Sequence, residues 1–148
     1  MRASTPPHLY VDLDGTLIAT DLLHESSLQL LRNSPLSVLR FPEWLLRGKA
    51  HLKRKIAERV KLDASVLPYR DDMLDIIRRA REQGRRVVLA TASDELLATS
   101  VAQHLGLFDH VIASDGTSNM SGGRKLEAIR ADAAGHADAA VALDAARR

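Results

Sequence analysis

The sequence predicts an α/β fold with a parallel sheet and a helical insertion after the first strand. From about residue 68 onward, short apolar runs with strand character alternate with amphipathic helical segments. That alternation is typical of a parallel sheet with crossover helices. The stretch 20–67, which separates the first strand from this region, has helical patterning. We therefore expect an α/β core formed by residues 1–19 and 68–148, with residues 20–67 as the insertion.

The first half of the chain begins with a strand at about residues 9–13, where an apolar run has β-branched and aromatic members. A helix is expected over 21–31, because Asp21 can cap it and its leucines supply an apolar face. The following apolar segment, 36–46, contains Pro42, which breaks or kinks a helix. After Gly48 the pattern predicts a basic helix.

The second half predicts three helices and two strands. An amphipathic helix over 71–83 ends at Gly84, and the second strand follows at 86–91. A helix over 94–105 ends at Gly106, a short third strand spans 110–113, and a last helix carries Lys125. Binding sites in open α/β sheets lie at the carboxyl ends of the strands. The insertion starts there, so we expect it to lie over the site as a lid.

Composition excludes several classes of function. The chain has 148 residues, a formal net charge of +2, 3% aromatic residues and no cysteine. The lack of cysteine excludes disulfides and thiolate metal sites and is typical of a cytoplasmic protein. Few aromatic residues argue against stacking on nucleobases, so no nucleic-acid partner is expected. The sequence shows neither a signal peptide nor an apolar run of about 18 residues, so we expect no transmembrane segment.

The most informative stretch is HLYVDLDGTLI, residues 8–18. Alternate side chains of a strand share one face, so Asp12 and Asp14 are expected to point the same way. A hard divalent cation such as Mg²⁺ would offset their repulsion. The pair can also divide roles, with one carboxylate as nucleophile and the other as proton donor. The alternative is an Asp-Gly turn in which Asp14 only caps the next helix.

Two further residues are candidates for binding phosphate. The hydroxyl of Thr91, at a strand end, and the backbone N–H of Ala92 could hold a phosphate oxygen, although Thr91 could equally end a strand without a ligand. Lys125 lies near a helix start, where the helix dipole also attracts anions. A solvated lysine is the alternative, and Arg124 leaves the register open by one position. Ser93 is expected to cap a helix.

These motifs resemble those of the haloacid dehalogenase-like superfamily. VDLDGTL resembles its first motif, VVLATAS its second, and the lysine of GGRKLEAI its third. The resemblance implies a Rossmann-like core with a small helical cap. It also implies a Mg²⁺-dependent phosphatase that acts on a small phosphorylated substrate through an aspartyl-phosphate. Asp12 would be the nucleophile and Asp14 the general acid and base.

The fourth motif of that superfamily, a set of acids after a later strand, is incomplete. Asp144, after the apolar run 139–143, is the best candidate to complete a metal site with Asp12 and Asp14; Asp138 and Asp132 fit worse. Nine of the eighteen residues from 131 to 148 are alanine, a bias that favours helix over strand. The chain therefore resembles a truncated family member that lacks its final strands, with an exposed edge on the first strand and weak metal binding.

The segment TDLLHESSLQLL and the string LATASDE resemble one subgroup more narrowly, the domain fused ahead of UbiA-type prenyltransferases. This resemblance implies an alternative function as a weakly active or non-catalytic module that self-associates or docks on a membrane prenyltransferase. Two interpretations of the basic stretch 47–61 stay open. It is a patch for an anionic substrate or membrane surface, or it is the solvent-exposed face of a cap helix. The apolar segment 36–46 beside it, which contains Trp44, keeps an interfacial role open.

Overall fold

The computed structural model describes residues 7–135 and 140–143. Four parallel strands form one sheet in the order β3-β2-β1-β4. The chain thus has the α/β architecture that the sequence predicts. The strands are β1 (His8–Val11), β2 (Val87–Asp94), β3 (His110–Ser114) and β4 (Ala140–Leu143).

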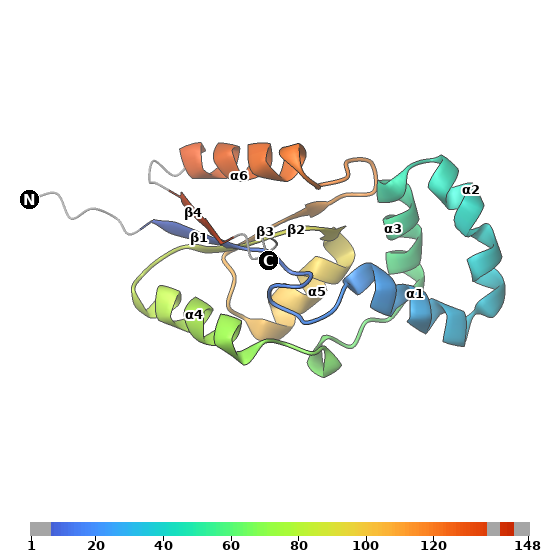
Figure 1. Ribbon diagram of the computed structural model, residues 1–148, viewed down its shortest axis with the longest axis horizontal. Coiled ribbons are helices and arrows are strands. Elements are labelled where there is room, and N and C mark those ends of the chain that lie inside the picture. Colours follow the sequence, from blue (N-terminus) through green and yellow to red (C-terminus); the bar gives the residue numbers. More distant parts are fainter. Residues whose placement is uncertain (1–6, 136–139, 144–148) are drawn as a thin grey trace, which may run out of the picture.

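Helices cover both faces of this sheet (Figure 1). On one face lie α4 (Asp71–Glu82) and α5 (Glu95–Leu105), and on the other lies α6 (Gly123–Gly135). The insertion between β1 and α4 lies at one end of the molecule. It consists of α1 (Leu22–Asn33), η1 (Pro35–Arg40), α2 (Phe41–Leu46), α3 (Lys49–Arg59) and η2 (Ala64–Val66).

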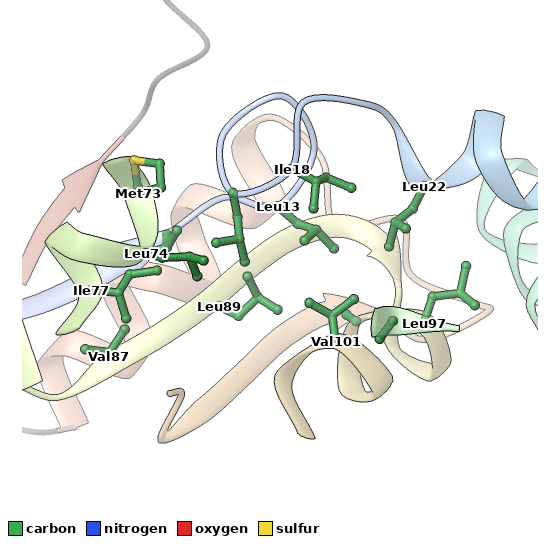
Figure 2. Close-up of a cluster of buried hydrophobic side chains, with 14 of the residues drawn as sticks. Leu13, Ile18, Leu22, Met73, Leu74, Ile77, Val87, Leu89, Leu97 and Val101 are labelled. Atoms are coloured by element: carbon green, nitrogen blue, oxygen red, sulfur yellow. The ribbon is translucent and has the colours of Figure 1, made fainter. Parts of the chain in front are cut away.

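The alternation of side chains along β1 builds two cores. Leu9 and Val11 join the larger cluster, between the sheet and helices α4 and α5. Tyr10 points to the opposite face and packs in a smaller cluster with residues of α6. Figure 2 shows the larger cluster, in which Leu89 of β2 lies among side chains from both covering helices. Because β1 and β2 are buried on both faces of the sheet, their sequences are nearly continuous apolar runs.

The insertion has a separate core of its own. Leu30, Trp44, Ile56 and Val60 are buried together. The guanidinium of Arg59 lies 4.7 Å from the centre of the Trp44 ring, a cation–π contact. Trp44 is only 2% exposed. Trp44 is therefore not available as the apolar contact of an interfacial segment 36–46, because its ring packs between α2 and α3.

The structure confirms two predicted helix ends, at Asp21 and Gly106, and places the cap of α5 at Asp94. The Asp21 carboxylate accepts the N–H groups of the first turn of α1 at 2.8 and 3.2 Å. Asp94 caps α5 by accepting the N–H of Leu96 at 2.9 Å. Gly106 ends α5 with φ 64°, a left-handed conformation that glycine adopts without strain.

The alanine-rich end differs from its prediction. Helix α6 ends at Gly135, and residues 140–143 form a strand whose register places Leu143 beside Val11. The expectation that β1 has an open edge is therefore wrong, because β2 and β4 flank it on both sides. Alanine's helix propensity is a weak preference, and pairing with the open backbone groups of β1 overrides it here.

Two strand boundaries also differ from expectation. β1 ends at Val11, two residues earlier than predicted, whereas β2 continues to Asp94. The pairing of β2 with β3 has an irregular register between Ala90 and Asp94. This irregularity lies where β2 carries its candidate site residues. Among the residues that the structure describes, no helix is long and apolar enough to cross a membrane.

Candidate active site

The predicted site residues lie at the carboxyl end of the sheet. The chain runs outward through β1, β2 and β3 and then crosses back to place β4 beside β1. In open α/β sheets such a reversal leaves a crevice at the carboxyl ends of the two strands. Asp12 is the first residue after β1, and Thr91 and Ser93 lie in the last part of β2. The topology therefore gathers both motifs at one edge.

Asp12 and Lys125 form an ion pair across this edge. The Lys125 Nζ, in the first turn of α6, lies 3.3 Å from Asp12 Oδ2. The other carboxylate oxygen, Oδ1, accepts the N–H of Leu13 at 2.9 Å. Both charged side chains are about one-fifth exposed, at 16% and 25%, so a solute can reach them. Arg124 is exposed, and the geometry places Lys125 rather than Arg124 at the carboxylate.

Asp14 is the second partly buried acid of the motif. Leu13 between the two acids is fully buried in the core, while Asp12 and Asp14 both stay partly exposed. Asp14 Oδ1 accepts the N–H of Leu22 at 2.8 Å, and Oδ2 accepts the hydroxyl of Ser93 at 2.7 Å. The first contact lies at the start of α1 and the second at the end of β2. Asp14 thus joins the insertion to the sheet.

Burial raises the pKa of the Asp14 carboxyl above its ordinary value. The hydrogen bonds from Leu22 and Ser93 oppose this rise, and the nearby charges of Asp21 and Asp12 add to it. The raised pKa keeps the proton on Asp14 to a higher pH than on a solvated aspartate. A carboxyl group with a raised pKa is a candidate proton donor.

Ser93 does not have the predicted capping role. Asp94 caps α5, while the Ser93 hydroxyl bonds to Asp14 instead. The physical reason is that β2 continues past Thr91, so Ser93 still belongs to the strand end and points toward the β1 loop. Its backbone N–H donates to Thr91 Oγ1 at 3.0 Å.

Thr91 and Ala92 lie at the base of the site. Thr91 is fully buried. The carbonyl of Ala92 accepts a hydrogen bond from Ser114 Oγ at 2.7 Å, and Ser114 Oγ in turn accepts the N–H of Met120 at 2.8 Å. These bonds tie the end of β2 to the loop that leads into α6. The loop that delivers Lys125 is thereby fixed to the segment that carries Thr91.

Lys53, from α3 of the insertion, also reaches this base. Its Nζ donates to the Ala92 carbonyl at 2.7 Å and to Asn119 Oδ1 at 2.8 Å. Burial lowers the pKa of Lys53, and the nearby acids Asp14 and Asp21 counteract that shift. Sequence reasoning grouped this lysine with a basic surface. The missed signal is its helical spacing, because Ala50 and Ala57, at i−3 and i+4, form the buried face of α3.

Arg54 holds the insertion to the core beside Lys53. Its guanidinium pairs with Asp94 Oδ2 and Glu95 Oε1, both at 2.9 Å. Gly116, in the loop before α6, lies against the Arg54 side chain with φ 92°; a Cβ there would meet Arg54 Cγ at 3.2 Å. The insertion, the end of β2 and the loop before α6 therefore meet around one site. Lys53 and Arg54 are thus bonded to the core and are not part of a fully solvated helix face.

The donor set limits the kind of metal site that can form. Within residues 7–135 and 140–143, no three acidic or histidine side chains cluster as metal ligands. Both carboxylates are engaged, Asp14 with Leu22 and Ser93 and Asp12 with Leu13 and Lys125. Burial raises the pKa of Asp14 and so disfavours its charged, metal-binding form, which leaves Asp12 as the main candidate ligand. Asp132 bonds to Tyr10 and Arg86, away from this edge. Asp138 and Asp144 lie outside the described residues.

These residues fit a Mg²⁺ ion that takes some of its ligands from the protein and the others from a substrate and from water. Mg²⁺ in phosphoryl-transfer sites keeps several waters and binds through one or two carboxylates plus substrate phosphate oxygens. Asp12, with an accessible carboxylate, matches that requirement. The described residues do not form an all-protein cage of the kind that binds a metal tightly without substrate.

Comparison with known proteins places the chain in a family. The family model described as haloacid dehalogenase-like hydrolase matches residues 9–148. The chain belongs to the haloacid dehalogenase-like hydrolase family. It is also 43% identical, over 120 residues, to the uncharacterized protein y4nM of Sinorhizobium fredii. That match covers 80% of this chain and 23% of the relative, so the chain spans about a quarter of the relative's length.

Solved structures share the fold at low sequence identity. A HAD family hydrolase from Salmonella enterica serovar Typhi aligns with a TM-score of 0.64 and 14% identity, over 92% of this chain and 56% of that one. A Bordetella pertussis protein of unknown function aligns with a TM-score of 0.58 and 19% identity, over 76% and 61%. A phosphoserine phosphohydrolase-like protein from Francisella tularensis aligns with a TM-score of 0.53 and 13% identity, over 93% and 76%. These likenesses support the fold.

Proposed function

We propose that this chain is a Mg²⁺-dependent phosphohydrolase that acts on a small phosphate ester through an aspartyl-phosphate. The observation that carries the proposal is the contact of 3.3 Å between Lys125 Nζ and Asp12 at the carboxyl end of β1. A second acid with a raised pKa, Asp14, follows two residues later. A nucleophilic carboxylate, a cation for the phosphate and a proton donor are the groups that two-step hydrolysis needs.

In the first step, an oxygen of the Asp12 carboxylate attacks phosphorus and the bond from phosphorus to the ester oxygen breaks. Asp14 gives its proton to the departing oxygen. In the second step, Asp14 takes a proton from water, whose oxygen attacks phosphorus and releases phosphate from Asp12. Lys125 holds the phosphate oxygens next to Asp12, with the hydroxyl of Thr91 and the N–H of Ala92 as further candidates. Mg²⁺ would neutralise negative charge on the phosphate.

We also propose that residues 20–67 act as a lid. Lys53 and Arg54 hold α3 over the end of β2, so the insertion covers the site from one side. A lid of this kind excludes water during phosphoryl transfer and contacts the part of the substrate that does not react. The core is then formed by residues 1–19 and 68–148.

Hydrolysis of an aryl phosphate such as p-nitrophenyl phosphate tests the proposed function. The purified chain is expected to release nitrophenol with Mg²⁺ and to stop when the metal is chelated with EDTA. A non-catalytic module, the alternative that the resemblance to UbiA-type fusion domains implies, would release nitrophenol no faster than an Asp12→Asn variant under the same conditions.

The hydrogen bond from Ser93 predicts a specific pH effect. Ser93→Ala removes a bond that favours the Asp14 carboxylate, so the already raised pKa of Asp14 should rise further. Because the first step needs protonated Asp14, the alkaline fall in kcat/KM should move to higher pH. The pH profile of kcat/KM measures this shift. Ser100→Ala, which removes a serine bond on the far side of α5, should leave the profile unchanged; an unchanged profile in Ser93→Ala would contradict the assignment of Asp14.

Substitution of Lys53 should lower the stability of the fold, whereas the same substitution at Lys55 should not. Lys53→Met keeps the aliphatic stem but removes two hydrogen bonds from a charged donor. We expect the free energy of unfolding to fall by about 1–3 kcal/mol. Lys55→Met is the matched control, since the Lys55 ammonium pairs with Glu58 at 3.6 Å on the surface and its removal should change stability by less than about 0.5 kcal/mol. Urea unfolding compares them, and equal effects would contradict the docking role of Lys53.

We propose Asp144 as a third acid of the metal site. The support is register, because β4 ends at Leu143 beside Val11 of β1, and Asp12 and Asp144 follow these two residues in the sequence. Asp144→Asn is expected to raise the Mg²⁺ concentration for half-maximal turnover roughly tenfold or more. Asp138→Asn is the control. If both variants need the same Mg²⁺ concentration as the parent chain, Asp144 is not a ligand.

A further inference from the structure

An apolar surface lies on the outer end of the insertion. Half of the ten large hydrophobic side chains that are exposed among the described residues fall within residues 31–46. Three of them are at least three-quarters exposed: Leu36 at 77%, Leu39 at 75% and Leu46 at 89%. Leu31 and Leu45 are about half exposed. We call these five leucines the leucine tip.

The leucine tip is separate from the core of the insertion. Leu30 of α1, Trp44 of α2 and Ile56 of α3 pack against one another in the core of the insertion. The five exposed leucines are not part of this core. The other exposed hydrophobic residues are spread over η2, α4, α5, α6 and the middle of α1. Exposure of several leucines to water is energetically unfavourable. Such an apolar patch often marks an interaction surface.

Exposed arginines alternate with the leucines of the tip along the sequence. Residues 31–47 contain Arg32, Arg40 and Arg47, all exposed, and a single acid, Glu43. Glu43 pairs with Arg40 at 3.4 Å. Arg32 and Arg47 form no ion pair with any residue that the structure describes. The surface is thus apolar with a net positive charge.

We propose that the leucine tip is a contact surface for an anionic lipid bilayer. Leucines of an amphipathic surface enter the boundary between headgroups and acyl chains, while arginines bind lipid phosphates around them. The position of the tip supports this occupant. Figure 1 shows η1 and α2 at the outer end of the molecule, away from the sheet, where a planar surface can approach without contacting the core.

The leucine tip differs from the basic stretch 47–61, which the sequence indicated as a candidate patch for an anionic surface. Lys53 and Arg54 are engaged with the core, and Arg59 lies over the Trp44 ring. The exposed apolar residues of the tip lie before α3 and are leucines rather than tryptophan. The proposal does not depend on catalysis, because none of the tip residues contacts Asp12 or Asp14.

Co-sedimentation of the purified chain with vesicles tests the proposal. We expect binding to vesicles of phosphatidylcholine with phosphatidylserine, little binding to phosphatidylcholine alone, and a loss of binding as salt rises. The triple variant Leu36→Ser, Leu39→Ser, Leu46→Ser should lower the bound fraction about tenfold at a fixed lipid concentration. Arg32→Gln with Arg47→Gln should remove the preference for anionic vesicles.

Matched variants on other faces distinguish binding by the leucine tip from non-specific binding to vesicles. Val66→Ser, Leu96→Ser and Leu126→Ser remove exposed hydrophobic side chains elsewhere, and Arg79→Gln with Arg130→Gln removes the same charge. Both controls should bind like the parent chain. Equal loss in control and tip variants, or no vesicle binding by the parent, would overturn the proposal. Concentration-dependent dimers in light scattering that the leucine triple variant abolishes would assign the tip to a second copy instead.

Discussion

Asp12→Asn is expected to lower Mg²⁺-dependent phosphate-ester turnover by about 10⁴-fold or more, to the background rate. An amide keeps the shape of the side chain but is a poor nucleophile and a weaker Mg²⁺ ligand. It also removes the negative charge that faces Lys125 at 3.3 Å. Steady-state kinetics with an aryl phosphate measures the loss.

We expect the loss of turnover in Asp12→Asn to come from the missing nucleophile and not from unfolding. Asp12 is partly exposed, so circular dichroism and the urea midpoint of the variant should stay close to those of the parent chain. Asp75→Asn, on the exposed face of α4, is a control of the same chemical change and should keep full activity. Full activity in folded Asp12→Asn would exclude Asp12 as the nucleophile.

Lys125→Ala is expected to lower kcat/KM by about 10²–10³-fold. The ammonium at the start of α6 neutralises charge where the phosphate would lie, and phosphoryl transfer depends mainly on such positioning and neutralisation. Binding of orthovanadate, a phosphate mimic, should weaken in parallel. Inhibition constants and kcat/KM measured on the same preparation test both effects.

Arg124→Ala is the matched control for Lys125→Ala. Arg124 precedes Lys125 on α6 and is exposed, so its removal should change kcat/KM by less than a factor of about three. A large loss in Arg124→Ala with no loss in Lys125→Ala would shift the assigned register by one residue. Equal small losses would remove the lysine from the mechanism.

Local signals explain the parts of this protein that sequence reasoning predicted correctly. Apolar runs located three strands, and Asp21 and Gly106 marked helix ends through bonds made within one turn. The rule that parallel strands end at one edge of the sheet placed Asp12 and Thr91 together. Lys125 was found through the resemblance of GGRKLEAI to the third family motif, and its ammonium lies 3.3 Å from Asp12.

Contacts between distant segments account for what was missed. The bond from Ser93 to Asp14 joins residues 79 positions apart, and Lys53 reaches Asn119 across 66 positions. Helical spacing with Ala50 and Ala57 could have placed Lys53 near the buried face of α3, but no local pattern identifies the strand-end carbonyl as its partner. The strand at 140–143 was also missed, because alanine favours helix until an open strand edge offers pairing.

The most direct test of the account is whether phosphate becomes attached to Asp12 during turnover. A reaction with aryl phosphate and Mg²⁺, quenched in acid and digested, is read by mass spectrometry of the peptide that contains residues 8–18. The account predicts the mass increment of one phosphoryl group on Asp12, lost after treatment with hydroxylamine and absent in Asp12→Asn. Turnover without a label on this peptide, or a label on another residue, would contradict it.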